Sequence, residues 1–357
     1  MEYRCARPLL WVIGVVCLLD LSSCQSNTPI EIDIWYGSEQ VFGEPGLAQR
    51  WINILGQATA PNGLRSLAYS LNGSKAERLT WGSDLHRLAK LGDFNVDLDT
   101  SDLKTGWNEL EIVAEDSIGN KAKAKVRIDF RRSGDPWPLP FEIKWREVDR
   151  LQDIVQIVDG SWYLTKEGVR NQDVYYDRML AFGDASWINY EVVTSVTFHS
   201  FTPPVPGPPT YNVSHAAIAV YWPGHGVDER QPHRQWYPLG ATAEFRLTQD
   251  LDSCRWRIFD GPKPEHENFY SEQEMADYRS IKLNTAYGMK HRVTDLGGDS
   301  TMYQVKLWDL NIPEPVDWDF TAVERQQNIR SGGAGLLAHN TEVTFGDVRV
   351  VLVDTLK

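Results

Sequence analysis

The sequence predicts an all-β protein built from two β-sandwiches. Apolar and polar residues alternate along many short stretches, most clearly from Tyr190 to His199, where every second side chain would lie on one face of a strand. Such a strand needs a second sheet to bury its apolar face. A chain of 357 residues is long enough for two cores of roughly 100–150 residues each. Only Glu272 to Arg279 suggests a helix, and a short one.

Residues 1–24 are typical of a signal peptide. Arg4 and Arg7 precede an apolar run from Leu9 to Leu19, which is too short to span a bilayer stably. The run is followed by Leu21-Ser22-Ser23-Cys24, which resembles the bacterial lipobox. The resemblance implies that Cys24 is lipidated and that the exported protein is anchored to a membrane of the bacterial cell envelope. The alternative is an ordinary signal peptide with a chance cysteine.

The cysteines exclude an internal disulfide in the exported protein. Cys5 and Cys17 would leave with the signal and Cys24 would carry the lipid, so Cys254 alone remains. Cys254 alternates with arginines and is in phase with Trp256. We therefore expect both to be buried in a core, and Cys254 not to be a nucleophile.

The charge of the chain argues against nucleic acid as a partner. The formal net charge is −13, and no run or stripe of Lys and Arg is present. A protein that wraps a polyanion needs such a basic surface.

Residues 25–130 predict the first sandwich, because short alternating strands are separated by polar turns there. Asn72-Gly73 predicts a tight hairpin turn. The stretches LNGS at 71–74 and GWNELEIVAEDSIGN at 106–120 resemble the late strands of bacterial immunoglobulin-like or cadherin-like modules. That resemblance implies an Ig-like β-sandwich that acts as a spacer. A Pro-rich linker at 131–140 then separates it from residues 141–357.

Residues 141–357 predict a two-sheet jelly roll, with eight or more strands and no crossover helices. The stretches DGSWYL, WINYEVVTSVTF and VTFGDVRVV occur in this order and resemble the concanavalin A-like, laminin-G-like jelly-roll superfamily. The resemblance implies glycan binding or glycan cleavage on the concave sheet or its rim. It also implies a possible structural Ca²⁺, although no loop matches a defined calcium motif and the metal site is unassigned.

The loop from Trp222 to Tyr237 is the richest candidate for a ligand site. It combines aromatic rings, imidazoles and planar donors in a Gly/Pro-shaped segment, a mixture that suits sugar rings and hydroxyls. The alternative is that its tryptophans only pack the loop onto the sheet. Elsewhere, Asp177 and Arg178 are expected to pair and support a turn. The predicted ligand-binding residues are Trp222, His225, His233, Arg234, Trp236 and Tyr237, joined by His199 if that residue lies on the concave sheet.

Two functions follow from these observations. The first is a non-catalytic surface or envelope lipoprotein that binds a polysaccharide or glycan through its jelly roll, with no catalytic residues. The second is a divergent jelly-roll glycoside hydrolase or polysaccharide lyase that uses carboxylates such as Asp228 or Glu229. No paired-carboxylate or Tyr/His lyase signature is present, so a binding protein is favoured over an enzyme.

Overall fold

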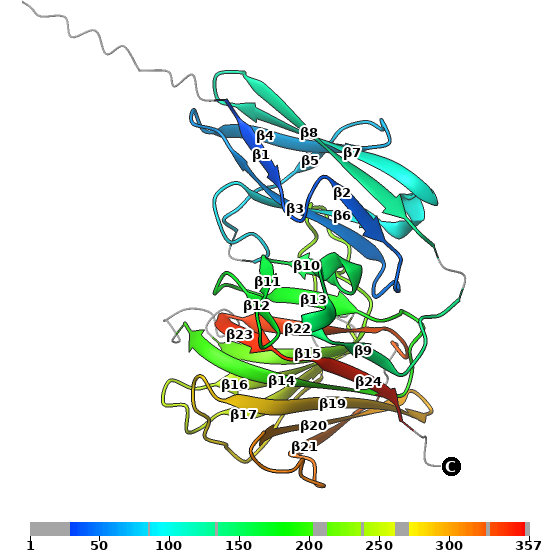
Figure 1. Cartoon of the computed structure of the whole chain (residues 1–357), viewed down its shortest axis with the longest axis vertical. Coiled ribbons are helices and arrows are strands. Elements are labelled where there is room, and N and C mark those ends of the chain that lie inside the picture. The colour runs from blue at the N-terminus through cyan, green and yellow to red at the C-terminus, as the bar shows by residue number, and fades with distance from the viewer. Residues whose placement is uncertain are drawn as a thin grey trace, which may run out of the picture.

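The computed structural model describes residues 29–84, 86–132, 135–202, 213–236, 239–260, 271–325 and 329–353. Their strands form four sheets, which build two β-sandwiches arranged along the long axis of the molecule (Figure 1). The prediction of an all-β fold is confirmed. No described helix is long and apolar enough to cross a membrane. The predicted signal peptide, including Cys24, lies outside the described residues, as does Tyr237.

The first sandwich packs a three-stranded sheet, β1-β3-β6, against a five-stranded sheet, β2-β8-β7-β4-β5. Its pairings are antiparallel except that of β2 with β8. Asn72 and Gly73 form the predicted turn between β4 and β5, with φ of 52° and 75°. Its strands are β1 Glu31–Ile34, β2 Glu39–Phe42, β3 Trp51–Thr59, β4 Leu64–Leu71, β5 Glu77–Leu79, β6 Asp93–Asp99, β7 Gly106–Asp116 and β8 Lys121–Phe130, with a 3₁₀ turn at Thr100–Asp102.

The second sandwich is the predicted jelly roll of two large sheets. A seven-stranded sheet has the order β10-β13-β22-β15-β16-β17-β18. A nine-stranded sheet contains β11-β12-β23-β14-β19-β20-β21, with β24 paired to β14 and β9 paired to β24. The strands are β9 Phe141–Ile143, β10 Gln156–Asp159, β11 Trp162–Leu164, β12 Val169–Asn171, β13 Arg178–Phe182, β14 Tyr190–Phe201, β15 Ser214–Trp222, β16 Ala241–Leu247, β17 Arg255–Asp260, β18 Ser271–Glu274, β19 Ala286–Gly297, β20 Ser300–Asp309, β21 Phe320–Arg325, β22 Gly333–His339, β23 Thr341–Phe345 and β24 Val348–Leu352, with 3₁₀ turns at Trp145–Glu147 and Leu151–Asp153.

The main core of the protein lies between these two sheets. Cys254 and Trp256 are fully buried there, and the Trp256 ring packs edge-on against Phe245, so their predicted place in the core is confirmed. The predicted helix near residue 272 is wrong. Ser271–Glu274 is strand β18, which pairs with β17, because sheet pairing outweighs a short local helix preference.

Alternation on β15 defines the face of the seven-stranded sheet that positions the candidate site. Ala216 and Ile218 point into the main core, whereas Ala217 and Ala219 belong to a smaller apolar cluster on the outer face. Ala48, from the first sandwich, packs in the same small cluster. The two sandwiches therefore touch along this outer face.

Candidate functional site

The loop that follows β15 is packed against the first sandwich. The Trp51 indole Nε1 donates to the carbonyl of His225 at 2.7 Å, and the Thr80 amide donates to the carbonyl of Gln231 at 2.9 Å. The Asp97 amide donates to the Gln231 side chain at 2.8 Å. The loop therefore forms part of the interface between the two sandwiches.

The predicted ligand residues of this loop that the structure describes have contacts within the protein. The Trp222 ring is almost fully buried against His225 and Trp236. His233 packs 4.7 Å from the Trp51 ring, and Arg234 pairs with Asp84 at 2.8 Å. These contacts match the packing alternative. Binding of a sugar by the loop stays a prediction.

His199 lies apart from this loop. It is on β14, in the nine-stranded sheet, whereas the loop follows a strand of the seven-stranded sheet. Its two ring nitrogens contact Asn284 Oδ1 at 2.9 Å and Thr344 Oγ1 at 2.8 Å. The structure therefore does not bring His199 to the other predicted ligand residues.

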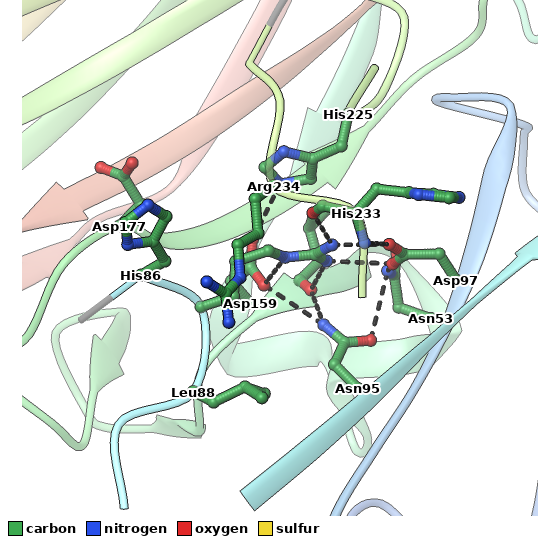
Figure 2. Close-up of polar contacts among 12 residues, drawn as sticks. Asn53, His86, Leu88, Asn95, Asp97, Asp159, Asp177, His225, His233 and Arg234 are labelled. Atoms are coloured by element: carbon green, nitrogen blue, oxygen red, sulfur yellow. Dashed lines mark hydrogen bonds and ion pairs between the residues drawn. The ribbon is translucent and has the colours of Figure 1, made fainter. Parts of the chain in front are cut away.

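A buried charged network, which we call the Arg87 network, joins the two sandwiches behind the loop (Figure 2). Arg87, from the first sandwich, bonds Asp97 Oδ2 and Asp159 Oδ1, each at 2.6 Å. Asn95 donates to Asp159 Oδ1 at 3.2 Å, and His225 Nε2 lies 3.1 Å from Asp159 Oδ2. Asp97 is on β6 of the first sandwich and Asp159 is on β10 of the second, so each sandwich supplies one carboxylate to Arg87. His225 belongs to the loop after β15.

Electrostatics in the Arg87 network favour the ionised forms. Burial alone would raise the pKa of Asp159, but the charges of Arg87 and His225 outweigh it and hold that pKa below its usual value. Burial would likewise lower the pKa of Arg87, and the two carboxylates raise it instead. Because its charged groups are paired and hydrogen-bonded, we infer that this network holds the two sandwiches in one relative position.

A second buried cluster, the His339 cluster, consists of Asp177, His215 and His339 on the outer face of the seven-stranded sheet. Asp177 Oδ1 lies 2.6 Å from His339 Nδ1. His215 is the direct cross-strand partner of His339, and their rings stack 4.6 Å apart at 7°. In Figure 2, Asp177 lies to one side of the Arg87 network, beside His86.

Arg178 holds the turn that presents Asp177. Its guanidinium donates to the carbonyls of Tyr176 and Asp177, and also to the carbonyl of Arg87 at 2.8 Å. Asp177 has a φ of 24°, which a non-glycine residue rarely adopts and which these bonds support. The predicted pairing of Asp177 with Arg178 is wrong in its partners: Arg178 supports the turn through backbone carbonyls, and the Asp177 carboxylate contacts His339 instead.

Two ring nitrogens of the His339 cluster have no hydrogen-bond partner among the described residues: His215 Nδ1 and His339 Nε2. His215 is 4% exposed and His339 is 3% exposed. Burial, with the charges of His339 and Arg257, holds the pKa of His215 well below its usual 6.5, so His215 is neutral at neutral pH. Buried polar atoms without partners are rare and mark candidates for function.

Charged residues extend the His339 cluster across the sheet in two neighbouring rows. The register of β22, β15, β16 and β17 sets His339, His215, Arg246 and Arg255 side by side. The adjacent row on the same face contains Glu244, Arg257 and Glu274, and Glu244 Oε2 accepts from Arg246 Nε at 2.9 Å. Arg255 and Glu274 keep about a third of their side chains exposed, 35% and 31%. The buried cluster therefore has an accessible polar rim.

Acid–base chemistry suits the His339 cluster better than metal binding. Its ligand atoms lie within 4.8 Å of one another. However, lone pairs of imidazoles lie in the ring planes, and two rings stacked at 7° cannot both direct them at one ion without rotating. Nitrogen ligands also suit Ca²⁺ poorly, so the possible structural Ca²⁺ stays a prediction with no assigned site. By contrast, the Asp177 carboxylate can accept the Nδ1–H of His339, and in that tautomer Nε2 carries a lone pair.

Asp177, His215 and His339 were not among the residues predicted from the sequence. They are separated by up to 162 positions, and only the pairing of β15 with β22 brings the two histidines together. The local signals, an aromatic-Asp-Arg turn and histidines at strand ends, are too common to identify a site.

Comparison with known proteins identifies no family. No protein-family model matches the chain, and no curated protein matches it. Among solved structures, it is similar to the Ca²⁺-bound exoplasmic/lumenal domain of VIP36, with 9% identity over 60% of this chain and 91% of that one, and a TM-score of 0.39. It is similar to alginate lyase Aly36B, with 10% identity over 55% and 85% of the two chains and a TM-score of 0.36. It is also similar to SGBP-B of Bacteroides ovatus in complex with a mixed-linkage heptasaccharide, with 13% identity over 89% of this chain and 99% of that one, and a TM-score of 0.19. Such low scores assign no function to this chain.

Proposed function

We propose that this chain is a lipoprotein of the bacterial cell envelope that binds a polysaccharide or glycan on the outer face of the seven-stranded sheet of its jelly roll. The observation that carries the proposal is the polar rows that start at His339 and end at the exposed Arg255 and Glu274. The first sandwich would lift this face away from the membrane.

The rows fit a polyhydroxylated chain. Neighbouring strands are about 4.8 Å apart, so the accessible end of the row presents Arg246 and Arg255 at this spacing, with side chains 19% and 35% exposed. Guanidinium groups donate and carboxylates accept, and a sugar hydroxyl can do both. The rings of Tyr176 and His86 stack 5.3 Å apart beside His339 and supply aromatic surface.

A glycan array with the chain from Cys24 onward, followed by calorimetry on any hit, tests this proposal. Arg255→Ala should weaken binding about tenfold or more, because a charge-assisted hydrogen bond contributes roughly 1.5–3 kcal/mol. Lys125→Ala, in an exposed ion pair of the first sandwich, is the matched control and should bind as the wild type does. A wild-type chain that binds no glycan contradicts the proposal.

The membrane anchor is proposed from the Leu21-Ser22-Ser23-Cys24 stretch alone. Labelled palmitate supplied to the host should appear in the wild-type protein and be absent from Cys24→Ala. Label retained by the variant would contradict lipidation at this residue.

Cleavage of the bound glycan is the second candidate, favoured by the bond between Asp177 and His339. An imidazole held by a carboxylate at Nδ1, with no hydrogen-bond partner for Nε2 among the described residues, is a group that can accept a proton at Nε2. If the cluster is catalytic, wild-type protein should release new reducing or unsaturated ends and His339→Gln should not, while both bind the glycan. Bound glycan that stays intact with wild-type protein would leave binding alone.

A further inference from the structure

A second surface feature lies on the opposite side of the jelly roll. A groove of about 540 Å³ opens on the outer face of the nine-stranded sheet, between β9, the centre of β14, β19 and β20, and the turn before β12. This volume is within the range of roughly 300–1,000 Å³ that small-molecule and cofactor sites occupy. The groove shares no lining residue with the His339 cluster or with the loop after β15.

The floor of the groove contains two glycines, Gly288 on β19 and Gly346 in the turn between β23 and β24, which allow neighbouring side chains to lie close to the backbone. Ser195, Gly288 and Trp308 are direct cross-strand neighbours, and the Trp308 ring lies over Gly288, where a Cβ would overlap it. A Cβ at Gly346 would likewise overlap the Ser195 hydroxyl. The lining also includes apolar surface from Leu310, which is 49% exposed. The result is a shallow trough with an indole held along it.

The rim of the groove carries charges of both signs. Lys144, Arg146, Lys166 and Arg349 supply donors, whereas Glu142, Glu167 and Asp347 supply acceptors. The seven charged residues therefore nearly cancel.

These features favour a neutral sugar chain as the occupant. A polyanion would meet three carboxylates on the rim, and a polycation would meet four basic groups. A peptide that binds by adding a strand needs an open sheet edge. Here β14 and β19 lie inside the sheet, with their backbone groups paired on both sides. Sugar hydroxyls can use donors and acceptors together, and ring C–H groups can pack on the apolar floor.

We propose that this groove is a second carbohydrate site, which takes a segment of a neutral polysaccharide. The inference rests on the proposed function in that the chain must bind glycans at all. Two sites on opposite faces of one jelly roll would let the protein hold one long polymer twice or cross-link two polymers, with a gain in avidity.

The test uses the chain from Cys24 onward and affinity electrophoresis in gels that contain a soluble β-glucan, a mannan, a xylan or, as the acidic probe, alginate. Ser195→Tyr fills the floor of the groove. Lys144→Ala with Arg349→Ala removes two exposed donors and keeps the floor, so this pair decides the matter if Ser195→Tyr does not fold by near-ultraviolet circular dichroism. Lys75→Ala, exposed on the first sandwich, is the control.

We expect retardation of the wild type by at least one neutral polysaccharide, a loss of about tenfold or more in affinity with Ser195→Tyr, a smaller loss with the double variant, and no change with Lys75→Ala. Arg255→Ala, on the other face, should keep this binding. If binding of a neutral polysaccharide is lost with Arg255→Ala and unchanged in both groove variants, the groove proposal is overturned and the proposed function remains. Binding of alginate alone has the same meaning, whereas a wild type that binds none of the probes overturns both.

Discussion

The Arg87 network and the His339 cluster are both buried, and both contain an aspartate beside a histidine. They differ in how many of their polar atoms have hydrogen-bond partners. In the Arg87 network each charged group has partners of opposite charge or backbone groups at hydrogen-bond distance. In the His339 cluster, two ring nitrogens make no hydrogen bond among the described residues, and the one on His215 has only Glu244 Oε2 nearby, at 4.0 Å. Since an unsatisfied buried polar atom costs about 1–3 kcal/mol, the first arrangement serves the fold and the second needs another explanation.

The difference also separates two neighbouring parts of one sheet face. The Arg87 network lies where β10 and the loop after β15 meet the first sandwich, and it closes that end of the face. The His339 cluster lies where β15 and β22 continue toward the polar rim of β16 and β17. We therefore place the candidate ligand site at the end with the His339 cluster. The loop at the other end, beside the Arg87 network, has more of the residue types that bind sugars.

The largest effect is expected from Arg87→Ala. It leaves Asp97 and Asp159 buried without their shared cation, so the free energy of unfolding should fall by about 3–5 kcal/mol. Urea denaturation would measure it, with Lys125→Ala as the exposed control, which should leave the free energy of unfolding nearly unchanged. A loss at Arg87 as small as that of the control would show that the network does not fix the two sandwiches.

A matched pair of histidine variants compares the two clusters directly. His225→Phe leaves Asp159 Oδ2 and the Gln235 carbonyl without their imidazole partner, so it should cost about 1–3 kcal/mol. His215→Phe removes an imidazole whose Nδ1 makes no hydrogen bond and lies 4.0 Å from Glu244 Oε2, so it should cost less than about 1 kcal/mol at neutral pH. The same denaturation curves give both values. Equal losses would remove the distinction between the clusters.

The dependence of stability on pH should reveal the neutral state of His215. Its folded pKa lies well below 6.5, so as the pH falls below 6.5 the unfolded chain takes up a proton that the folded chain does not. Stability is thus complete above pH 6.5, and each such histidine removes about 1.4 kcal/mol per pH unit below it.

His291 is the control for this measurement. It is buried between the sheets, and burial lowers its pKa to about 4 in spite of its bond to the Ile218 carbonyl. Its contribution therefore lies between pH 6.5 and about 4. His215→Phe should reduce the slope of the unfolding free energy against pH by the amount that corresponds to one proton. The part of the slope that His291 contributes should remain. An unchanged slope would mean that folded His215 is protonated.

The smallest effect is expected from metal ions. Because the stacked rings of His215 and His339 cannot both face one ion, Zn²⁺ or a chelator should leave the melting temperature of the wild type unchanged. A rise in melting temperature with Zn²⁺ that is lost in His215→Phe would show that the rings rotate and bind it.

The sequence alone determined the features that depend on local periodicity. Alternation from Tyr190 to His199 predicted β14, and the phase of Cys254 and Trp256 predicted their burial. Asn72-Gly73 predicted its hairpin, because left-handed backbone at both positions suits few other residue pairs. Each of these signals is contained within a dozen residues.

The tertiary structure decided which polar residues meet. His215 and His339 face each other only because β15 pairs with β22 in one register, and a slip of one residue would turn both into the core. The loop from Trp222 onward has a composition suited to a sugar, but it docks on the first sandwich through Arg87 and Trp51. Trp222, His225 and His233 are buried there. Composition specifies what a side chain can bond, whereas pairing between distant segments determines what lies beside it.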